Sequence, residues 1–512
     1  MTTAPLDRGF IDVNACFGPE HGMAGTAGAS LASLVAEQRA NGVHRTLAWS
    51  LVAAWADGPT GDRLAAEAAT DAASGLAAIS CLQPRRSEDA ARRVAAAEGA
   101  GVVGYRLHGW TRTGGPSIAG VVPDAVRDAL RAAATTGRPI LLPIGASGDA
   151  SAIGAATADL GVPVIVVGAH YTTIVDALAA AVRHPHLHLE TSAMAHFRAI
   201  ETAVRTIGAE RVLLGSGSPI RAAASPIGAI LAAAVPDEAK RAILGGNAAR
   251  LFDLDPGTID LAPSGAPSRA FDVHTHFGPL DFDVPDVPDA SLLEELRVPP
   301  ASRAVASSAI AIFGDPERGN AQAARAAREG AGRGSLAYVV VDPADVEFSE
   351  TQVRRFLDAP GFVGAKVHGE WSGVPTASRA MTDLFDLLAR SGRPVKIHNA
   401  GDGWDTALAA IAASHPGLPI VIAHGGLGTP SIEGARLAAT HDNVYVEWSS
   451  SFADLRTVRA AAAIAPPERI LWGSDAPLLD PAFVLGTYER AGFREADLER
   501  IFWDNAAALF GT

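Results

Sequence analysis

The residues best suited to chemistry are two histidines, His274 and His276, at the end of the run Phe-Asp-Val-His-Thr-His-Phe. The run alternates apolar and polar side chains and then breaks at Gly278-Pro279, which predicts a short strand that ends there. Because side chains alternate across a strand, Asp272, His274 and His276 share one face, and two imidazoles so placed can bind one metal ion. Among 15 histidines in 512 residues such a pair also arises by chance, so its meaning depends on the residues that accompany it.

The elements that would position this pair follow from the order of apolar segments along the chain. Short runs rich in Val, Ile and Leu alternate with Ala-rich amphipathic segments, a pattern typical of parallel strands joined by crossover helices. In the first half, the strands are predicted near residues 9–13, 43–49, 77–82, 102–108, 139–143, 163–168, 187–190 and 212–215. In the second half, they are predicted near residues 271–276, 304–312, 336–341, 363–368, 394–398, 419–424, 444–448 and 470–474.

Each half thus carries the elements of one closed barrel. We predict an α/β fold of two fused (β/α)8 TIM-type barrels, formed by residues 1–252 and 270–512. Between them, residues 253–269 are rich in Pro, Gly and Ser and show no periodicity, so we expect a linker there.

Composition and charge narrow the class of partner. Of the 512 residues, 48% are hydrophobic and 19% are charged, as in an ordinary globular protein. The net charge of −14 argues against a nucleic acid or an anionic membrane as partner. Two cysteines are too few for a disulfide framework, and we find neither a targeting leader nor a long apolar run. We therefore expect a small-molecule substrate and a cytoplasmic location.

The second half of the chain repeats the first. The segment Val-Gly-Tyr-Arg-Leu-His-Gly at 103–109 matches Val-Gly-Ala-Lys-Val-His-Gly at 363–369. Near the end of each half, Asn-Ala-Ala-Arg-Leu-Phe at 247–252 matches Asn-Ala-Ala-Ala-Leu-Phe at 505–510. Such self-similarity at a nearly constant offset indicates an internal duplication.

The two copies disagree at five positions that could bind a metal or move a proton. In the second copy these are His274, His276, His398, His424 and Asp475; the first copy has, in the same order, Asn14, Cys16, Pro143, Gly168 and Gly217. All five positions follow predicted strands, at the catalytic end of a parallel barrel. We interpret the second copy as the working site and the first as a retained, degenerate barrel without metal.

Taken together, these motifs resemble the amidohydrolase superfamily. They are Asp-Val-His-Thr-His at 272–276, Lys-Ile-His at 396–398, Ala-His-Gly-Gly at 423–426, Gly-Ser-Asp-Ala-Pro at 473–477 and the closing Asn-Ala-Ala-x-Leu-Phe. More narrowly, the set resembles the amidohydrolase-related branch that includes aminocarboxymuconate semialdehyde decarboxylase and pyrone dicarboxylate lactonase. The resemblance covers residues 271–512 in order and spacing, and residues 8–252 in scaffold only.

This resemblance implies a metal site and a division of labour within it. His274, His276, His398 and Asp475 would bind one divalent ion, usually zinc, and His424 would steer or deprotonate the water that the ion activates. Three neutral imidazoles and one carboxylate suit Zn²⁺, leave a position open for water and would lower the pKa of that water.

Further residues are weaker candidates for contact with the substrate. Lys366 could bind a substrate carboxylate, could be carbamylated to bridge two metals, or could simply fill a layer of the barrel. His368 recurs in the first copy, which favours support of the scaffold over chemistry. Trp371, Trp404 and Trp448 follow predicted strands and could form walls of the pocket.

Three functions compete at this stage. The first is a metal-dependent hydrolase that attacks an amide, lactone or related carbonyl bond. The alternatives are a metal-dependent, non-oxidative decarboxylase of an unsaturated carboxylic acid, and a non-catalytic binding scaffold. The barrel itself does not separate them, because function resides in the site. Family relatives are commonly dimers, so we expect the two barrels to pair within the chain, with a higher oligomer possible.

Each chain is expected to bind one divalent ion tightly, in its second half only, because the five proposed metal and proton sites are confined to that copy. Elemental analysis of the purified protein checks this. A variant with His274→Ala and His276→Ala together should lose the metal, and stoichiometric metal in that variant would contradict the assignment.

Overall fold

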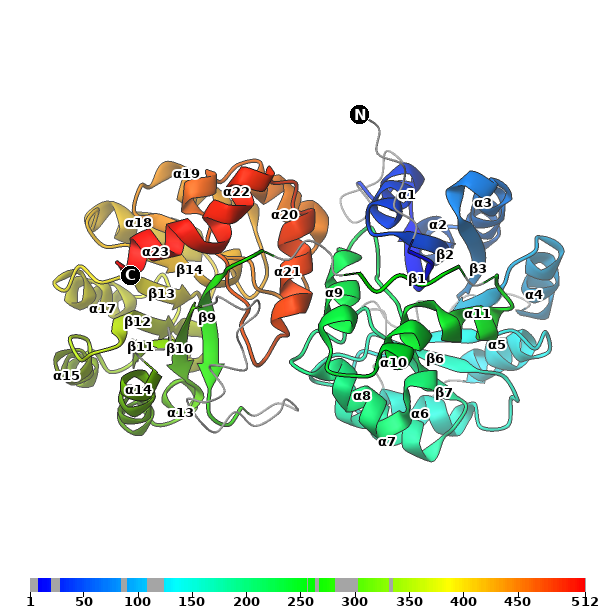
Figure 1. Cartoon of the computed structure of the whole chain (residues 1–512), viewed down its shortest axis with the longest axis horizontal. Helices are drawn as coiled ribbons and strands as arrows, with labels where there is room; N and C mark the ends of the chain where they lie inside the picture. The colour runs from blue at the N-terminus through cyan, green and yellow to red at the C-terminus, as the bar shows by residue number, and fades with distance from the viewer. Residues whose placement is uncertain are drawn as a thin grey trace. The chain divides into compact units, whose positions relative to one another are not determined.

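The chain divides into two compact units, Met1–Ser264 and Gly265–Thr512, and in each of them helices surround the strands (Figure 1). The computed structural model describes residues 8–19, 28–83, 90–107, 124–255, 257–262, 267–280, 303–330 and 335–511. Within those ranges, every helix is too short or too polar to cross a lipid bilayer.

The first unit is built on a parallel sheet of eight strands that follow one another in sequence order. The strands are β1 (Phe10–Phe17), β2 (Val43–Ser50), β3 (Leu76–Leu82), β4 (Gly104–Leu107), β5 (Ile140–Pro143), β6 (Val164–Val167), β7 (Leu187–Glu190) and β8 (Val212–Leu213). The backbone N–H of Val13 donates to the carbonyl of Leu214 at 2.9 Å, which joins the last strand to the first and closes the barrel.

Helices between these strands cover the outside of the barrel. They are α1 (Leu31–Ala40), α2 (Leu51–Trp55), α3 (Gly58–Thr70), α4 (Ala90–Gly99), α5 (Asp124–Ala134), α6 (Asp149–Ala156), α7 (Ile174–Arg183), α8 (Ala199–Ile207), α9 (Ala224–Ala232), α10 (Asp237–Arg241) and α11 (Asn247–Phe252). The resulting βα order is the one predicted from the alternation of apolar runs with Ala-rich segments.

The second unit repeats this arrangement with seven assigned strands, again in sequence order. They are β9 (Phe271–Phe277), β10 (Arg303–Ser308), β11 (Ser335–Val341), β12 (Phe362–His368), β13 (Val395–His398), β14 (Ile420–Ile422) and β15 (Val444–Val446). At 470–474, the position of the predicted eighth strand, single parallel bridges replace a continuous strand: Val446 pairs with Ile470, and Thr275 with Ala476. The fold class is thus confirmed, with a shorter closing segment than expected.

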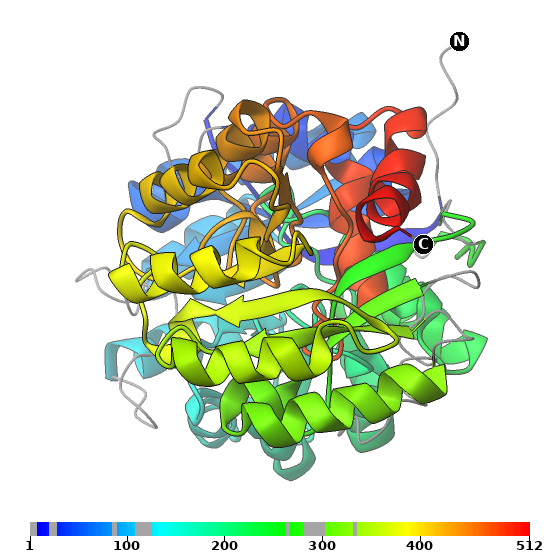
Figure 2. The ribbon, with the colours of Figure 1, turned by 90° about the vertical axis from the view of Figure 1, so that its left-hand side faces the viewer.

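The helices of the second unit lie outside its strands (Figure 2). They are α13 (Ala309–Phe313), α14 (Pro316–Gly330), α15 (Val346–Phe356), α16 (Gly369–Ser372), α17 (Arg379–Ala389), α18 (Trp404–Ser414), α19 (Ile432–Thr440), α20 (Leu455–Ala462), α21 (Pro481–Arg490), α22 (Glu495–Glu499) and α23 (Asn505–Phe510).

Matched contacts explain why the repeated motifs recur. Asn247 donates from Nδ2 to the carbonyls of Ala209 and Val212 at 2.7 and 2.8 Å. Asn505 donates to Pro467 and Ile470 at the same two distances. In both units the closing Asn-Ala-Ala-x-Leu-Phe motif therefore ties the final helix to the last position of the barrel.

A buried aspartate at the start of each barrel plays a second matched role. Asp12 accepts hydrogen bonds from the backbone N–H and the hydroxyl of Ser216. Asp272 accepts the same pair from Ser474. This contact fixes the loop that follows the eighth position against the first strand, and in the second unit Asp475 lies on that loop.

Part of the segment predicted as a linker packs on the first unit. Gly257 approaches Gly9 so closely that a Cβ on Gly257 would lie 2.7 Å from the Cα of Gly9. Asp260 donates its N–H to the carbonyl of Arg8 at 3.0 Å, and Ile259 packs against the core. The division between the units falls after this contact, at Ser264.

Candidate metal centre

Three electron-pair donors converge at the end of β9. His276 Nε2 lies 3.2 Å from His274 Nε2. Asp475 Oδ1 lies 3.0 Å from His276 Nε2 and 3.3 Å from His274 Nε2. All three side chains are buried, and their ligand atoms lie within 4.8 Å of one another. Two imidazole nitrogens and a carboxylate oxygen that face each other at these distances form a donor set that suits a divalent cation.

Hydrogen bonds on the far side of each ring direct Nε2 to this centre. His274 Nδ1 lies 2.8 Å from Glu447 Oε1, and an ionised carboxylate can only accept, so Nδ1 carries the proton and Nε2 the lone pair. His276 Nδ1 lies 2.9 Å from the hydroxyl of Ser307 on β10. The hydroxyl oxygen can accept a hydrogen bond from Nδ1–H in the same way. Such contacts behind the ligands fix the tautomer that a metal requires.

Glu447 connects more of the site than any sequence motif indicated. Besides His274 Nδ1, its Oε1 accepts from Lys396 Nζ at 2.9 Å and from the N–H of His424 at 3.0 Å. Its Oε2 accepts from the N–H of Ser449 at 2.8 Å. Although burial opposes ionisation, Lys396 and His274 hold the pKa of Glu447 well below its usual range. This carboxylate therefore stays charged and orients β9, β13 and the loop after β14 together.

His424 lies beside the three donors but presents a different atom. Its Nδ1 is 2.6 Å from the carbonyl of Ser449. A carbonyl only accepts, so Nδ1 carries the proton and Nε2 is left as an acceptor. Its ring centroid lies 5.0 Å from that of His274. His424 can therefore accept a proton or a hydrogen bond at the edge of the centre.

His398, the remaining predicted ligand, lies apart from the converging trio. It ends β13, and its Nε2 is 2.9 Å from Glu370 Oε2, on α16. Its ring stacks on His368 with centroids 4.2 Å apart and meets His424 at 4.7 Å. The structure thus brings together His274, His276 and Asp475, with His398 in the adjacent layer of rings.

Burial sets the charge of the site. It is the largest cause that lowers the pKa of both His274 and His276, and it lowers the pKa of His424 to about 4. For Asp475, burial acts in the opposite direction, but His274 and His276 hold its pKa below the usual range. At neutral pH the site therefore presents neutral imidazoles and an ionised carboxylate, the protonation states in which these groups bind metals.

Lys366 projects from β12 into the same centre. Its Nζ lies 3.2 Å from His274 Nε2, and the side chain is fully buried. Burial, together with the charge of Lys396, lowers the pKa of Lys366 to about 7. An amine in this position can hold a positive charge next to the converging donors.

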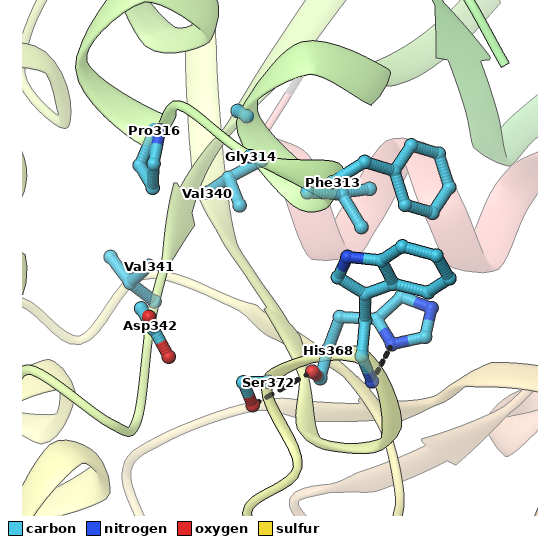
Figure 3. A pocket seen from close by; sticks show the side chains of 11 residues that line it. Phe313, Gly314, Pro316, Val340, Val341, Asp342, His368 and Ser372 are labelled. Carbon is cyan, nitrogen blue, oxygen red and sulfur yellow. Dashed lines mark hydrogen bonds between the residues drawn. The ribbon is translucent and has the colours of Figure 1, made fainter. Parts of the chain in front are cut away.

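A cavity of about 170 Å³ borders the ring of His368. It lies at the carboxyl ends of β10, β11 and β12, and in Figure 3 Phe313 and His368 face Val341 and Asp342 across it. Trp371 also lines the cavity and meets Phe313 edge to face, with centroids 4.5 Å apart. His368 Nδ1 accepts the N–H of Trp371 at 3.2 Å, which caps α16. His368 thus both supports α16 and borders the cavity.

The other two tryptophans that the sequence suggested as pocket walls, Trp404 and Trp448, are buried. Trp404 begins α18 and is 7% exposed. Trp448 is completely buried and stacks on Phe493, with centroids 5.9 Å apart. A Cβ at Gly425 would lie only 2.5 Å from Trp448 Cδ1, so the indole requires glycine after His424. Of the three candidate tryptophans, Trp371 borders the cavity.

Sequence reasoning missed the residues that hold the ligands. Ser307 and Ser449 match no metal motif, and Lys396 belongs to the Lys-Ile-His motif without any signal of its contact with Glu447. A carboxylate such as Glu370 on a short helix carries no signal of its contact either. Glu447 does carry one, because Glu190 occupies the same position in the first copy. That agreement predicts structural support, and the contacts of Glu447 show support directed at the site.

Two of the candidate site residues have a strained backbone conformation. His424 has φ of 57° and Asp475 has φ of 65°, in the left-handed region that side chains with a Cβ avoid. In the first unit the same two positions are Gly168, with φ of 88°, and Gly217, with φ of 71°. The backbone bends alike in both units, and glycine relieves the strain where the side chain is absent.

The sequence profile described as Amidohydrolase matches the chain twice, at residues 12–254 and 271–512. These two matches cover nearly the whole chain. A search of curated proteins finds no match.

Solved structures similar to the chain each cover about one unit of it. The 2,6-dihydroxybenzoate decarboxylase from Rhizobium is 18% identical, with a TM-score of 0.37, over 48% of this chain and 99% of that one. A dihydroxybenzoic acid decarboxylase from Polaromonas sp. JS666, with bound manganese, is 19% identical, with a TM-score of 0.36, over 48% and 97%. The 5-carboxyvanillate decarboxylase from Novosphingobium aromaticivorans, complexed with manganese, is 14% identical, with a TM-score of 0.38, over 48% and 96%.

The backbone at Asp475 gives a prediction for the metal-free protein. Asp475→Gly and Asp475→Ala both remove the carboxylate, but only Ala keeps a Cβ at positive φ. We expect the Gly variant to be more stable by about 1 kcal/mol, because the left-handed conformation costs that much for a residue with a Cβ. Urea unfolding of the two variants measures the difference. Gly217→Ala in the first unit should be destabilised for the same reason, and equal stability of Asp475→Ala and Asp475→Gly would contradict the strain.

Proposed function

We propose that this chain, which belongs to the amidohydrolase family, is a metal-dependent hydrolase whose active site lies in the second unit. The observation that carries the proposal is the convergence of His274 Nε2, His276 Nε2 and Asp475 Oδ1 at 3.0 to 3.3 Å. Two imidazole nitrogens and a carboxylate oxygen this close together suit a shared divalent cation. The reaction would be attack of water on a carbonyl-type bond, such as an amide or a lactone, of a small molecule.

The donor set fits a divalent ion, and zinc is our proposed metal. His274, His276 and Asp475 would hold it, with His398 as a fourth ligand if its ring turns from Glu370 to the centre. When bound, the ion would supply Lewis-acid activation of the carbonyl and lower the pKa of a water molecule.

Asp475 is suited to moving the proton. Its Oδ1 faces the two histidines, while Oδ2 makes no hydrogen bond with any residue in the described ranges. The lowered pKa keeps this carboxylate ionised at neutral pH. Oδ2 can therefore take a proton from the attacking water and pass it to the leaving group.

His424 is suited to orienting the water. Its Nδ1 proton is held by the carbonyl of Ser449, so the neutral ring offers Nε2 as an acceptor. An acceptor on one side and the Asp475 carboxylate on another would align a water molecule for attack.

The substrate would enter from the cavity at the ends of β10 to β12. Its walls of Phe313 and Trp371 suit an apolar or flat portion of the substrate. Lys366 would attract a carboxylate of the substrate towards the centre.

A decarboxylase is the second candidate, and the position of Lys366 favours it. An ammonium 3.2 Å from His274 Nε2 would hold a carboxylate beside the ion, and in that reaction this carboxylate leaves as carbon dioxide. A test with candidate carboxylic esters, lactones and unsaturated acids separates the two. Incorporation of ¹⁸O from labelled water without carbon dioxide supports the hydrolase, and carbon dioxide release refutes it in favour of the decarboxylase.

For the first unit, we propose a barrel without metal that supports the second. At the five positions where the second unit has its proposed site residues, the first unit has neither an imidazole nor a carboxylate. Pairing of the two barrels in the manner of a dimer would account for its retention.

Substitutions should separate the roles of Asp475 and His424. Asp475→Asn is expected to lower kcat by about a hundredfold or more, the usual effect of losing acid–base catalysis, and to weaken metal binding. His424→Ala should keep the metal and lose most of the rate. Steady-state kinetics measure the rates, and metal analysis measures the bound ion. His415→Ala is the control, because His415, at the end of α18, pairs with Asp386 of α17.

The contrary outcome is specific. If His424→Ala releases the ion as readily as His398→Ala, then His424 is itself a ligand. The cluster of His274, His424 and Glu447 would then form a second site, and a binuclear centre with Lys366 would replace the single-ion site.

A further inference from the structure

In the first unit, arginines stand where the second unit has its reactive centre. Arg106 on β4 occupies the position of Lys366, and Asn14 on β1 that of His274. Arg221 occupies the position of Leu479: its N–H donates to the carbonyl of Gly217 at 3.1 Å, as that of Leu479 does to Asp475 at 3.1 Å. The first unit thus has the cation Arg221 where the second has the apolar Leu479, and the backbone makes the same hydrogen bond at both positions.

Arg106 is a buried cation with few partners. It is 6% exposed. Its Nη1 donates to Asn14 Oδ1 at 3.1 Å, and its Cζ lies 4.7 Å from the ring centroid of Trp49. Its Nε, also buried, has no hydrogen-bond acceptor within the described ranges. Among the described residues, this guanidinium meets a neutral amide and an indole, and an anion bound there would offset the cost of burying its charge.

Arg221 approaches the same group of residues from the loop after β8. Its Nη1 donates to the carbonyl of Ser192 at 2.8 Å. The hydroxyl of Ser192 in turn accepts from Asn14 Nδ2 at 3.3 Å. Asn14 and Ser192 therefore join the two arginines at the carboxyl end of the barrel.

Among the described residues, the carboxylate of Glu190 acts to raise the pKa of both Arg106 and Arg221. Its oxygens already accept from the N–H of Gly168 at 3.0 Å, and from the N–H and hydroxyl of Ser192 at 2.8 and 2.7 Å. Glu190 therefore interacts with Arg106 through its charge and not through a hydrogen bond.

The first unit also holds two buried histidines, His170 and His196. Burial lowers the pKa of His170 to about 3 and that of His196 to about 4, so both are neutral at pH 7. After burial, the charge of Arg221 is the next cause that lowers the pKa of His170. His196 Nδ1 is buried and has no hydrogen-bond partner in the described part of the chain.

We propose that the first unit binds a small oxyanion, a carboxylate or a phosphate, at the carboxyl end of its barrel through Arg106 and Arg221. In this barrel, two guanidiniums replace the divalent ion as the positive charge that a ligand meets. Their planar donor groups match the two oxygens of a carboxylate or phosphate. The site is separate from the proposed catalytic centre and does not depend on the reaction assigned to it.

The test is calorimetric titration of the full chain in chloride-free buffer with sodium acetate and, separately, with inorganic phosphate. Acetamide serves as the neutral analogue of acetate. At least one of the two anions should bind, and acetamide should not. The anion that binds identifies the ligand as a carboxylate or a phosphate; binding of neither overturns the proposal.

Variants locate the binding. Arg106→Met and Arg221→Leu should each weaken it at least tenfold, because a buried charge-assisted hydrogen bond is lost. Arg205→Leu removes an exposed arginine of α8 and should leave it unchanged. The variant with His274→Ala and His276→Ala should also bind normally, whereas loss of binding there places the anion in the second unit and overturns the proposal.

Two checks separate binding from folding. Arg221→Leu installs the residue that the second unit carries at the same backbone position, and Arg106→Lys keeps the charge. Circular dichroism should show wild-type folding for both, and Arg106→Lys should retain more affinity than Arg106→Met. Wild-type affinity in Arg106→Met and Arg221→Leu, or equal losses in Arg106→Lys and Arg106→Met, would contradict a role for the guanidinium charge.

Discussion

The second unit depends on one buried carboxylate, that of Glu447. Removing a carboxylate from water costs several kcal/mol, so it remains charged only if close donors replace the water. Lys396 Nζ, His274 Nδ1 and the N–H groups of His424 and Ser449 are those donors. The same contacts that keep Glu447 ionised set the tautomer of His274 and fix the backbone at His424. Breaking a buried pair of this kind typically costs about 3–5 kcal/mol, so site geometry and fold stability are coupled here.

The first unit keeps this acid among different side chains. Glu190 accepts from Gly168 and Ser192 in the way that Glu447 accepts from His424 and Ser449. The carboxylate therefore belongs to the scaffold of both barrels. What differs is the set of side chains it orients: glycine replaces the histidine, and the left-handed backbone at that position carries no strain. The first unit thus has glycine, which adopts positive φ without strain, at both positions where the second unit has a strained His424 or Asp475.

The sequence predicted the parts of the structure that repeat along the chain. Alternation of apolar runs and Ala-rich segments predicted the βα order of both units. The comparison of copies singled out His274, His276, His398, His424 and Asp475, of which His274, His276 and Asp475 converge in the structure. The closing segment at 470–474 was overestimated, because a strand joined by single bridges has the same apolar composition as a longer one. Long-range partners were out of reach: Lys396 belongs to a recognised motif and Ser307 to none, but no local pattern encodes the side-chain contacts that either residue makes. Trp448 illustrates the same limit, since only the fold shows that it packs beneath Gly425 rather than beside the cavity.

The central claim is that one cation lies among His274, His276 and Asp475 and that the first unit holds none. The most direct measurement is anomalous X-ray scattering from crystals of the full chain, collected on both sides of the absorption edge of the bound metal. The account predicts a single anomalous peak within bonding distance of His274 Nε2, His276 Nε2 and Asp475. A peak near Asn14 and Cys16, or a metal in the second unit that leaves these three residues uncoordinated, would contradict it.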